Sequence, residues 1–222
     1  MPEPQTSPRL SDATVDLLGV LAYGELTAFE RLATDARFAP TIGAQMALAA
    51  MAVAEFGHFQ ALHAHLTGAG IDPEAAMRPF VAPLKRFHDS TPPKSWLESL
   101  IKAYVGDGLA TDFYREVAAF VPDAPTRELV LSVLADTGQA SFAVARVREA
   151  VQADPTVAGR LALWARRLVG EALIQAQQVA VERDALTELL VGGSGDLASI
   201  GALLGRLTDR HTERMATLGL DP

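Results

Sequence analysis

The sequence predicts an all-α protein, an antiparallel four-helix bundle with two additional C-terminal helices, on three observations. Apolar residues recur at helical spacing almost throughout the 222-residue chain, whereas no window shows a convincing two-residue alternation of β-branched residues. Proline and glycine interrupt the helical pattern only at intervals. The segments between these interruptions form two pairs with short turns, separated by one long, proline-rich connection, which is a known connectivity of four-helix bundles.

Each expected helix has a recognisable start or stop. Ser11 is a good N-cap for the first helix, and Pro40 cannot continue it. The second helix stops at Gly68 and Gly70. The expected bundle helices cover Ser11 to near Arg37, about 42–67, about 95–120 and about 126–152, and the additional helices cover about 156–191 and about 197–217.

The connection 69–93 contains five prolines and one expected short helix in "IDPEAAM". In this helix Asp72 is the cap and Pro73 takes the first helical position. With 49% hydrophobic residues the chain can bury a sizeable core. We expect a single domain over 1–222, with the core bundle at about 11–152 and the additional helices at about 156–217.

Composition excludes several classes of chemistry. The chain has no cysteine, so a metal site must use carboxylates, histidines or neutral oxygens. A net charge of −8 argues against tight non-specific binding of nucleic acid. No apolar run approaches the roughly 20 residues of a membrane span, so we expect none. The N-terminus lacks the regions of a signal peptide, so we expect a cytoplasmic protein.

Two short patterns occur twice at nearly the same offset. "GELTAFE" at 24–30 and "GDGLATD" at 106–112 both read glycine, acid, four residues, acid. "EFGH" at 55–58 and "DTGQ" at 136–139 both read acid, any residue, glycine, polar residue. The first pair is offset by 82 residues and the second by 81. The two helical pairs therefore read as copies of one hairpin.

The repeat places one acid near the middle of each bundle helix: Glu25, Glu55, Asp107 and Asp136. Residues three apart share a helix face, so His58 points the same way as Glu55, and Gln139 the same way as Asp136. Four buried, unpaired carboxylates would each cost several kcal/mol. They must therefore be protonated, paired or bound to a cation.

Two of these helices offer a second acid five residues further on. Glu30 diverges from Glu25 by about 140° around the helix. Glu25 shares its side with apolar residues such as Leu21 and Leu32, so we expect Glu25 to face inward. The same argument prefers Asp107 to Asp112.

This set of residues resembles the ferritin-like di-iron carboxylate superfamily. There, two helices each supply one Glu and the other two each supply an E-x-x-H pair. The segment "LWARRLVGEALIQAQQVAVERDAL" at 163–186 is also similar to a narrower bacterial group, the tRNA methylthio-isopentenyladenosine hydroxylase-like (MiaE-like) family. The superfamily resemblance covers about 20–152, and the narrower one covers most of the chain.

The resemblance implies iron, as one or two ions. In the first half-site Glu25 would be a terminal ligand, Glu55 a bridging ligand and His58 the third ligand. In the second half-site Asp107, Asp136 and Gln139 would take the corresponding places. Every ligand there departs from the family pattern, because Asp reaches less far than Glu and a Gln amide is a poor iron ligand. A mono-metal site or a lapsed enzyme is therefore a serious alternative.

Other polar residues have candidate roles around such a site. Tyr23 and Tyr104 lie near two of the acids and could donate hydrogen bonds to them. Three arginines recur every four residues on the last helix, Arg206, Arg210 and Arg214. They would be phosphate contacts if the substrate were RNA, but the acids interspersed among them favour a salt-bridged surface.

Two hypotheses about function remain open at this stage. The first is an O2-dependent, non-haem iron hydroxylase resembling those that act on a modified adenosine side chain of tRNA, so that tRNA would be a partner. The second is a non-catalytic helical protein that kept the bundle after losing part or all of the metal site. A homodimer is compatible with either, and the sequence leaves the catalytic residues and any nucleic-acid-binding residues undefined.

Overall fold

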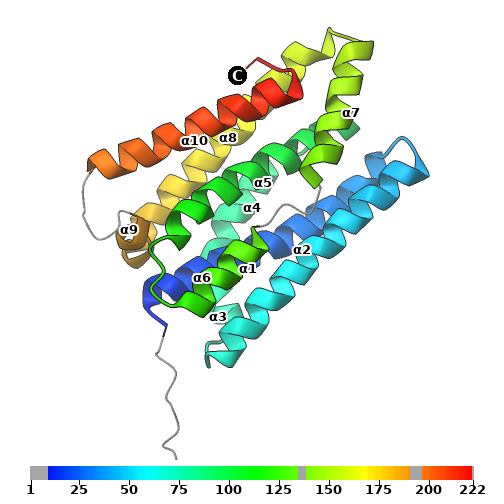
Figure 1. Cartoon of the computed structure of the whole chain (residues 1–222). Coiled ribbons are helices and arrows are strands. Elements are labelled where there is room, and N and C mark those ends of the chain that lie inside the picture. Colours follow the sequence, from blue (N-terminus) through cyan, green and yellow to red (C-terminus); the bar gives the residue numbers. More distant parts are fainter. Residues whose placement is uncertain (1–9, 135–138, 191–196, 222) are drawn as a thin grey trace, which may run out of the picture.

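The computed structural model describes residues 10–134, 139–190 and 197–221, and every regular element in these ranges is a helix (Figure 1). The all-α prediction is therefore confirmed. In chain order the elements are α1 (Asp12–Asp35), η1 (Ala36–Phe38), α2 (Ile42–Gly68), α3 (Pro73–Met77), η2 (Arg78–Phe80), α4 (Val81–Ser90), α5 (Trp96–Ala118), α6 (Ala124–Val133), α7 (Gln139–Ala153), α8 (Val157–Glu182), α9 (Asp184–Leu190) and α10 (Leu197–Leu218).

Local capping explains where several helices begin. The Ser11 hydroxyl accepts a hydrogen bond from the Thr14 amide at 3.2 Å, and Thr41 caps α2 in the same way at 3.1 Å. Asp123 caps α6 by accepting from the Thr126 amide at 2.8 Å. Such side chains satisfy amides that have no partner within the helix. The expected starts of the first two helices are therefore correct.

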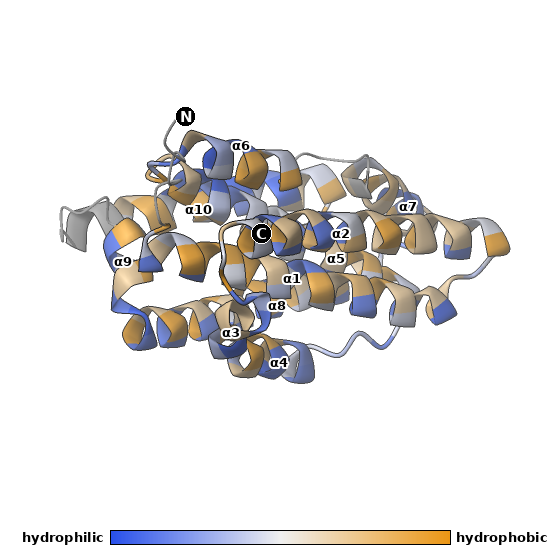
Figure 2. Cartoon of the chain, turned by 90° about the horizontal axis from the view of Figure 1, so that it is seen from below, coloured by the Kyte–Doolittle hydropathy of each residue, from blue (hydrophilic) through white to orange (hydrophobic). Residues whose placement is uncertain are grey.

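α5 contacts the helices α1, α6, α7, α8, α9 and α10. α1 and α2 form a long antiparallel pair, and α5 contacts α1 on one side and α8 and α10 on another (Figure 1). α6 and α4 lie on opposite sides of the bundle when it is seen from below (Figure 2). The two additional helices are thus part of the packed core, because Leu161 and Leu168 of α8 and Met215 of α10 share a hydrophobic cluster with α5.

The hydrophobic core consists of two clusters that lie at different levels along the helices. The first cluster takes Leu32 of α1 and residues within 48–52 of α2 and 100–105 of α5. The second cluster takes residues within 17–22 of α1, 62–66 of α2 and 117–118 of α5. The mid-helix acids of these three helices fall in the gap between the two levels. The fold therefore leaves a polar layer inside the bundle.

Three of the expected element boundaries are wrong. The connection 69–93 contains the ten-residue helix α4 besides the expected short one. The helix expected over 126–152 is two helices, α6 and α7. α6 ends at Val133, and the guanidinium of Arg115 donates to the carbonyl of the next residue, Leu134, at 3.0 Å. Residues 135–138 between them lie outside the described ranges.

The helix expected over 156–191 is interrupted at Arg183. Its backbone leaves the helical region there, with φ −131° and ψ 77°, and its guanidinium contacts both carboxylate oxygens of the buried Asp16 on α1. This interruption turns α9 onto α1, where Leu186 joins the second cluster. The break in the helix thus coincides with the residue that forms the ion pair between Arg183 and α1.

α2 has the length and composition of a helix that could cross a membrane, which the sequence analysis did not anticipate. Core helices of other proteins share this length and composition, so these two properties are weak evidence for a membrane span. In this fold α2 runs along α1 and presents Glu55 and His58 to it.

Candidate metal centre

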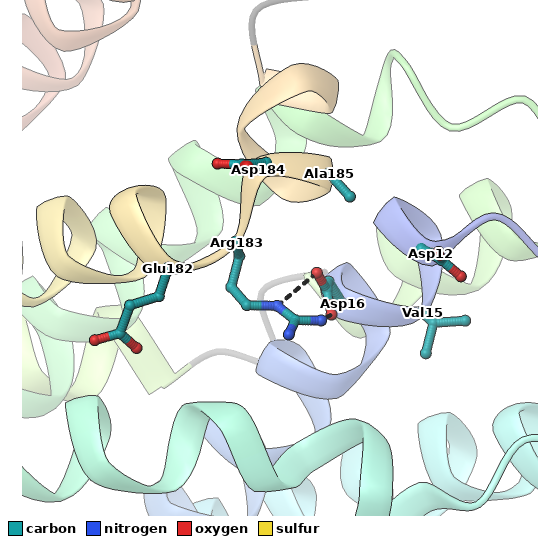
Figure 3. A pocket seen from close by; sticks show the side chains of 7 residues that line it. All are labelled: Asp12, Val15, Asp16, Glu182, Arg183, Asp184 and Ala185. Atoms are coloured by element: carbon teal, nitrogen blue, oxygen red, sulfur yellow. Dashed lines mark hydrogen bonds and ion pairs between the residues drawn. The ribbon is translucent and has the colours of Figure 1, made fainter.

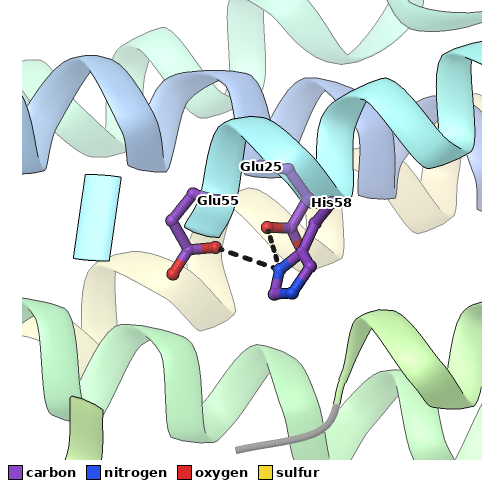
Figure 4. Close-up of side chains that lie close together, drawn as sticks. All are labelled: Glu25, Glu55 and His58. Atoms are coloured by element: carbon purple, nitrogen blue, oxygen red, sulfur yellow. Dashed lines mark ion pairs between the residues drawn. The ribbon is translucent and has the colours of Figure 1, made fainter. Parts of the chain in front are cut away.

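Glu25, Glu55 and His58 meet at the interface of α1 and α2 (Figure 4). The His58 Nδ1 atom lies 3.4 Å from the Glu25 Oε2 atom and 3.6 Å from the Glu55 Oε2 atom. One ligand atom from each residue lies within 4.8 Å of the other two. Because α1 and α2 are antiparallel, residues 25 and 55–58 reach the same level, and the i, i+3 spacing puts Glu55 and His58 on one face.

The three side chains are largely shielded from water, with exposed fractions of 12% for Glu25, 7% for Glu55 and 21% for His58. Glu30 is exposed, so Glu25 is the acid of this helix that faces inward. The Glu25 Oε2 and His58 Nδ1 atoms are buried yet make no hydrogen bond of normal geometry. Buried polar atoms of this kind normally have a partner, and a cation bound by the cluster would supply one.

The electrostatics of the cluster favour protons or a cation. Burial raises the pKa of the Glu25 carboxyl to about 9, although the nearby His58 imidazole acts in the opposite direction. The two carboxylates, Glu25 first, raise the pKa of His58 to about 10. At neutral pH the metal-free cluster therefore keeps its protons, and a metal ion would displace them.

The donor set fits a first-row transition metal. Carboxylate oxygens and one imidazole nitrogen are ligands that iron accepts, and three such groups leave coordination positions open. The residues would hold the ion between α1 and α2.

A cavity of about 190 Å³ adjoins the cluster. Glu25, Glu55 and His58 line it, and the facing helix α5 contributes Tyr104 and Asp107. The end of α6, the start of α7 and one side chain of α10 complete its wall, through residues such as Leu134, Ala140 and Arg214. The cavity thus lies in the polar layer between the two hydrophobic clusters.

The second predicted half-site differs from the first. Asp107 and Asp112 both line the cavity, but Asp107 is exposed and Asp112 is buried, so the expectation that Asp107 is the more buried acid of α5 is wrong. The role of Asp107 as a metal ligand stays a prediction. Asp112 forms ion pairs with Arg214 and, at 3.5 Å, with Arg210. A buried acid can face inward here because the additional helix α10 brings guanidinium groups to it, a contact that periodicity within α5 does not reveal.

The other two second-site residues are not placed. Asp136 lies outside the described residues. Gln139 begins α7, beside Ala140 in the cavity wall, but its side chain lies outside the described part of the structure. Whether they act as ligands therefore stays a prediction.

The two tyrosines have different surroundings. Tyr104 lines the cavity. Tyr23 instead packs against the second cluster, where burial and the neighbouring Glu30 raise the pKa of its hydroxyl. The sequence analysis missed Tyr114, whose pKa is raised by burial and by the Glu25 charge. Tyr114 lies seven residues after Asp107, on the same face of α5, and this spacing could have identified it as a candidate.

All three arginines of α10 form ion pairs with acids of α5. Arg206 contacts Glu116 at 2.9 Å, and Arg210 contacts the same carboxylate at 3.2 Å. Arg214 pairs with Asp112. The salt-bridged interpretation of this stripe is therefore the one that the structure supports.

A second, more open pocket of about 250 Å³ lies where α8 meets α9 (Figure 3). The ion pair between Arg183 and Asp16 occupies its centre. Both oxygens of Asp16 are already engaged, so we interpret this pocket as a structural connection between α1 and α9.

The fold and the cluster together define a class: a helical bundle with carboxylates and a histidine in a polar layer at mid-helix, as in ferritin-like proteins. Residues 8–193 match the model of a family described as "ferritin-like domain, actinomycetes". The chain belongs to this ferritin-like family. No curated protein matches it. The narrower resemblance to tRNA hydroxylases therefore stays a hypothesis.

Proposed function

We propose that this ferritin-like protein is a non-haem iron oxygenase that uses one iron ion held by Glu25, Glu55 and His58. The observation that carries the proposal is the three-donor cluster beside a cavity, with two of its polar atoms buried and lacking a hydrogen bond of normal geometry. A purely structural cluster would be expected to satisfy those atoms within the protein.

When bound, the iron would supply activation of O2 for attack on an unreactive C–H bond. The residues of the chain have three tasks around it. The two carboxylates and the imidazole hold and orient the ion. The hydrophobic clusters above and below the polar layer limit the access of water. The Tyr104 hydroxyl and the Asp107 carboxylate line the space in which a substrate group would lie.

The proposal specifies one iron because the buried acid of the facing wall, Asp112, is already paired with an arginine. The Arg214 guanidinium lines the cavity and pairs with Asp112. A second dication there would be repelled by the guanidinium and would have to compete for its partner acid. We therefore expect a second ion to bind far more weakly than the first.

Metal analysis after anaerobic reconstitution with ferrous iron tests the proposal. We expect about one iron per chain, lost in Glu55→Gln and retained in Glu30→Gln, which changes an exposed acid on the same helix as Glu25. Consumption of O2 by the iron-loaded protein in the presence of a reductant tests the oxygenase assignment. Two tightly held irons would contradict the single-ion site. No iron, with Glu55→Gln unchanged in stability, would favour the non-catalytic alternative.

The substrate is a separate proposal. The resemblance at 163–186 makes a modified adenosine side chain of tRNA the first substrate to test, in a cytoplasmic setting. Arg206 and Arg210, which could have contacted phosphates, are held by acids of α5. Comparison of hydroxylated tRNA nucleosides from cells with and without the gene decides the question, since unchanged profiles would remove tRNA as the substrate.

A further inference from the structure

One edge of the Arg214 guanidinium has no hydrogen-bond partner inside the molecule. The side chain is only 13% exposed, lines the cavity, and uses its Nη1 atom for the ion pair with Asp112. Its Nε and Nη2 atoms are buried and have no hydrogen-bond partner. These two N–H groups lie side by side along one edge of the guanidinium plane, so together they form an unoccupied two-pronged donor.

The same edge holds carboxylates elsewhere in this structure. Arg183 donates from Nε and Nη2 to the two oxygens of Asp16, the first at 2.9 Å. Arg206 donates from Nε and Nη2 to the two oxygens of Glu116, at 3.3 Å and 2.9 Å. Two parallel N–H···O bonds are the geometry in which arginine recognises planar carboxylates. The corresponding edge of Arg214 lacks such a carboxylate among the described residues.

The charges around Arg214 leave room for one negative charge. In the ion pairs between α10 and α5, three guanidinium groups meet two carboxylates, those of Asp112 and Glu116. The pairs therefore carry one surplus positive charge. Within the cavity itself, four acids (Glu25, Glu55, Asp107 and Asp112) face His58, Arg115 and Arg214. Repulsion by these acids grows with the charge of the ligand, so a monoanion is favoured over a dianion.

Gly108 makes space for this arrangement. A Cβ atom at position 108 would lie 2.8 Å from the Arg214 Cδ atom and 3.0 Å from its Nε atom. Any other residue on this turn of α5 would displace the arginine side chain. The absence of a side chain at 108 thus lets Arg214 lie against α5.

We propose that the cavity binds the carboxylate of a small monoanionic organic acid, which accepts hydrogen bonds from the Nε and Nη2 atoms of Arg214. The cavity volume of about 190 Å³ suits an acid of a few carbon atoms and is below the range of pockets for drug-sized ligands. The bound acid would lie between Arg214 and the Glu25, Glu55 and His58 cluster. As a substrate of the oxygenase this acid would take the place of the tRNA side chain, and that role rests on the proposed function, whereas the carboxylate site itself does not.

Titration of the metal-free protein with propionate tests the site, with chloride at equal ionic strength as the reference. Arginine side-chain ¹⁵N–¹H spectra should show one Nε–H resonance that shifts saturably, and calorimetry should give one propionate per chain. Loss of the two-pronged contact in Arg214→Lys should weaken binding about tenfold or more, since hydrogen bonds to charged groups are worth 1.5–3 kcal/mol. Arg206→Lys, which changes a matched arginine on the same helix, should bind propionate as the unaltered protein does.

A second variant leaves the arginine in place. Gly108→Ala should also weaken propionate binding, because it removes the space that the Arg214 side chain occupies. Circular dichroism checks that each variant is folded, and the titration of the unaltered chain decides the matter if a variant is not. Absence of a saturable shift, equal affinity in Arg214→Lys, or tighter binding of inorganic phosphate than of propionate would each overturn the proposal.

The metal-free design separates this inference from the proposed function. Propionate binding in a chain that takes up no iron would leave the carboxylate site standing and the oxygenase refuted. Iron binding without propionate binding would refute the carboxylate site alone.

Discussion

The Nδ1 atom of His58 on α2 lies 3.4 Å from the Oε2 atom of Glu25 on α1, inside the bundle. Both atoms are buried, and neither makes a hydrogen bond of normal geometry. The fold therefore holds two ionisable groups close together without a hydrogen bond of normal geometry between them. This relationship is expected of residues that share a metal ion, and it underlies the first two predictions.

Replacement of either carboxylate should abolish tight metal binding. In Glu25→Gln or Glu55→Gln, one anionic oxygen becomes an amide, and Co²⁺ or Fe²⁺ affinity should fall by more than about 100-fold, beyond the loss caused by altering an outer partner. Competition with a chromophoric chelator measures this loss. Glu30→Gln is the control and should bind as before, because Glu30 is exposed. Equal affinities in all three variants would place the metal elsewhere.

The stability of the metal-free protein should fall as the pH rises through the neutral range. The pKa of Glu25 is raised from 4.5 to about 9, and that of His58 from 6.5 to about 10. Between these values, each group binds more protons in the folded state than in the unfolded state. Their contribution to the free energy of unfolding is therefore present at low pH and is lost by about pH 10. Urea unfolding at pH 6, 7.5 and 9 measures the trend.

The matched variant for this prediction is Glu25→Gln. Other buried groups titrate in the same range, such as Lys102, whose pKa burial lowers to about 8. The difference between the unaltered chain and Glu25→Gln removes their contribution. The variant should show a shallower decline with pH, and identical slopes would show that Glu25 does not titrate in this way.

Gly19→Ala should destabilise the fold. A Cβ atom at position 19 of α1 would lie 2.2 Å from the carbonyl oxygen of Ala76, so the backbone of α3 would have to move. Overpacking of this kind costs about 1–3 kcal/mol. Gly24→Ala on the same helix is the control, because its Cβ would meet no atom within 4 Å, and it should stabilise by about 0.5–1 kcal/mol. Chemical denaturation distinguishes the two, and similar effects at both positions would contradict the close approach of α1 and α3.

Asp16→Asn should loosen the attachment of α9 to α1. The Asp16 side chain is 5% exposed and binds Arg183 through both oxygens. Removal of one partner of a buried ion pair costs about 3–5 kcal/mol, and we expect about 2 kcal/mol here because the Arg183 side chain is 36% exposed. Hydrogen exchange should also increase in α9 before it increases in α5. Unchanged stability would show that the ion pair does not hold this junction.

The sequence by itself determined the helices whose signals are local. The starts of α1 and α2 follow from the caps Ser11 and Thr41, which act within one turn of the chain. The Glu25, Glu55 and His58 cluster also follows from short-range spacing combined with the repeat, because antiparallel neighbours bring mid-helix residues to one level. The family match over 8–193 agrees with that prediction of the fold.

Only the tertiary structure decided the features that depend on distant contacts. Arg183 interrupts a helix to reach Asp16, 167 residues away, and Arg214 reaches Asp112 across 102 residues. Helical periodicity within α5 favoured Asp107 as the buried acid, but a guanidinium from α10 stabilises Asp112 instead. The energy of a buried charge depends on which opposite charge lies next to it, and that neighbour exists only after the chain has folded.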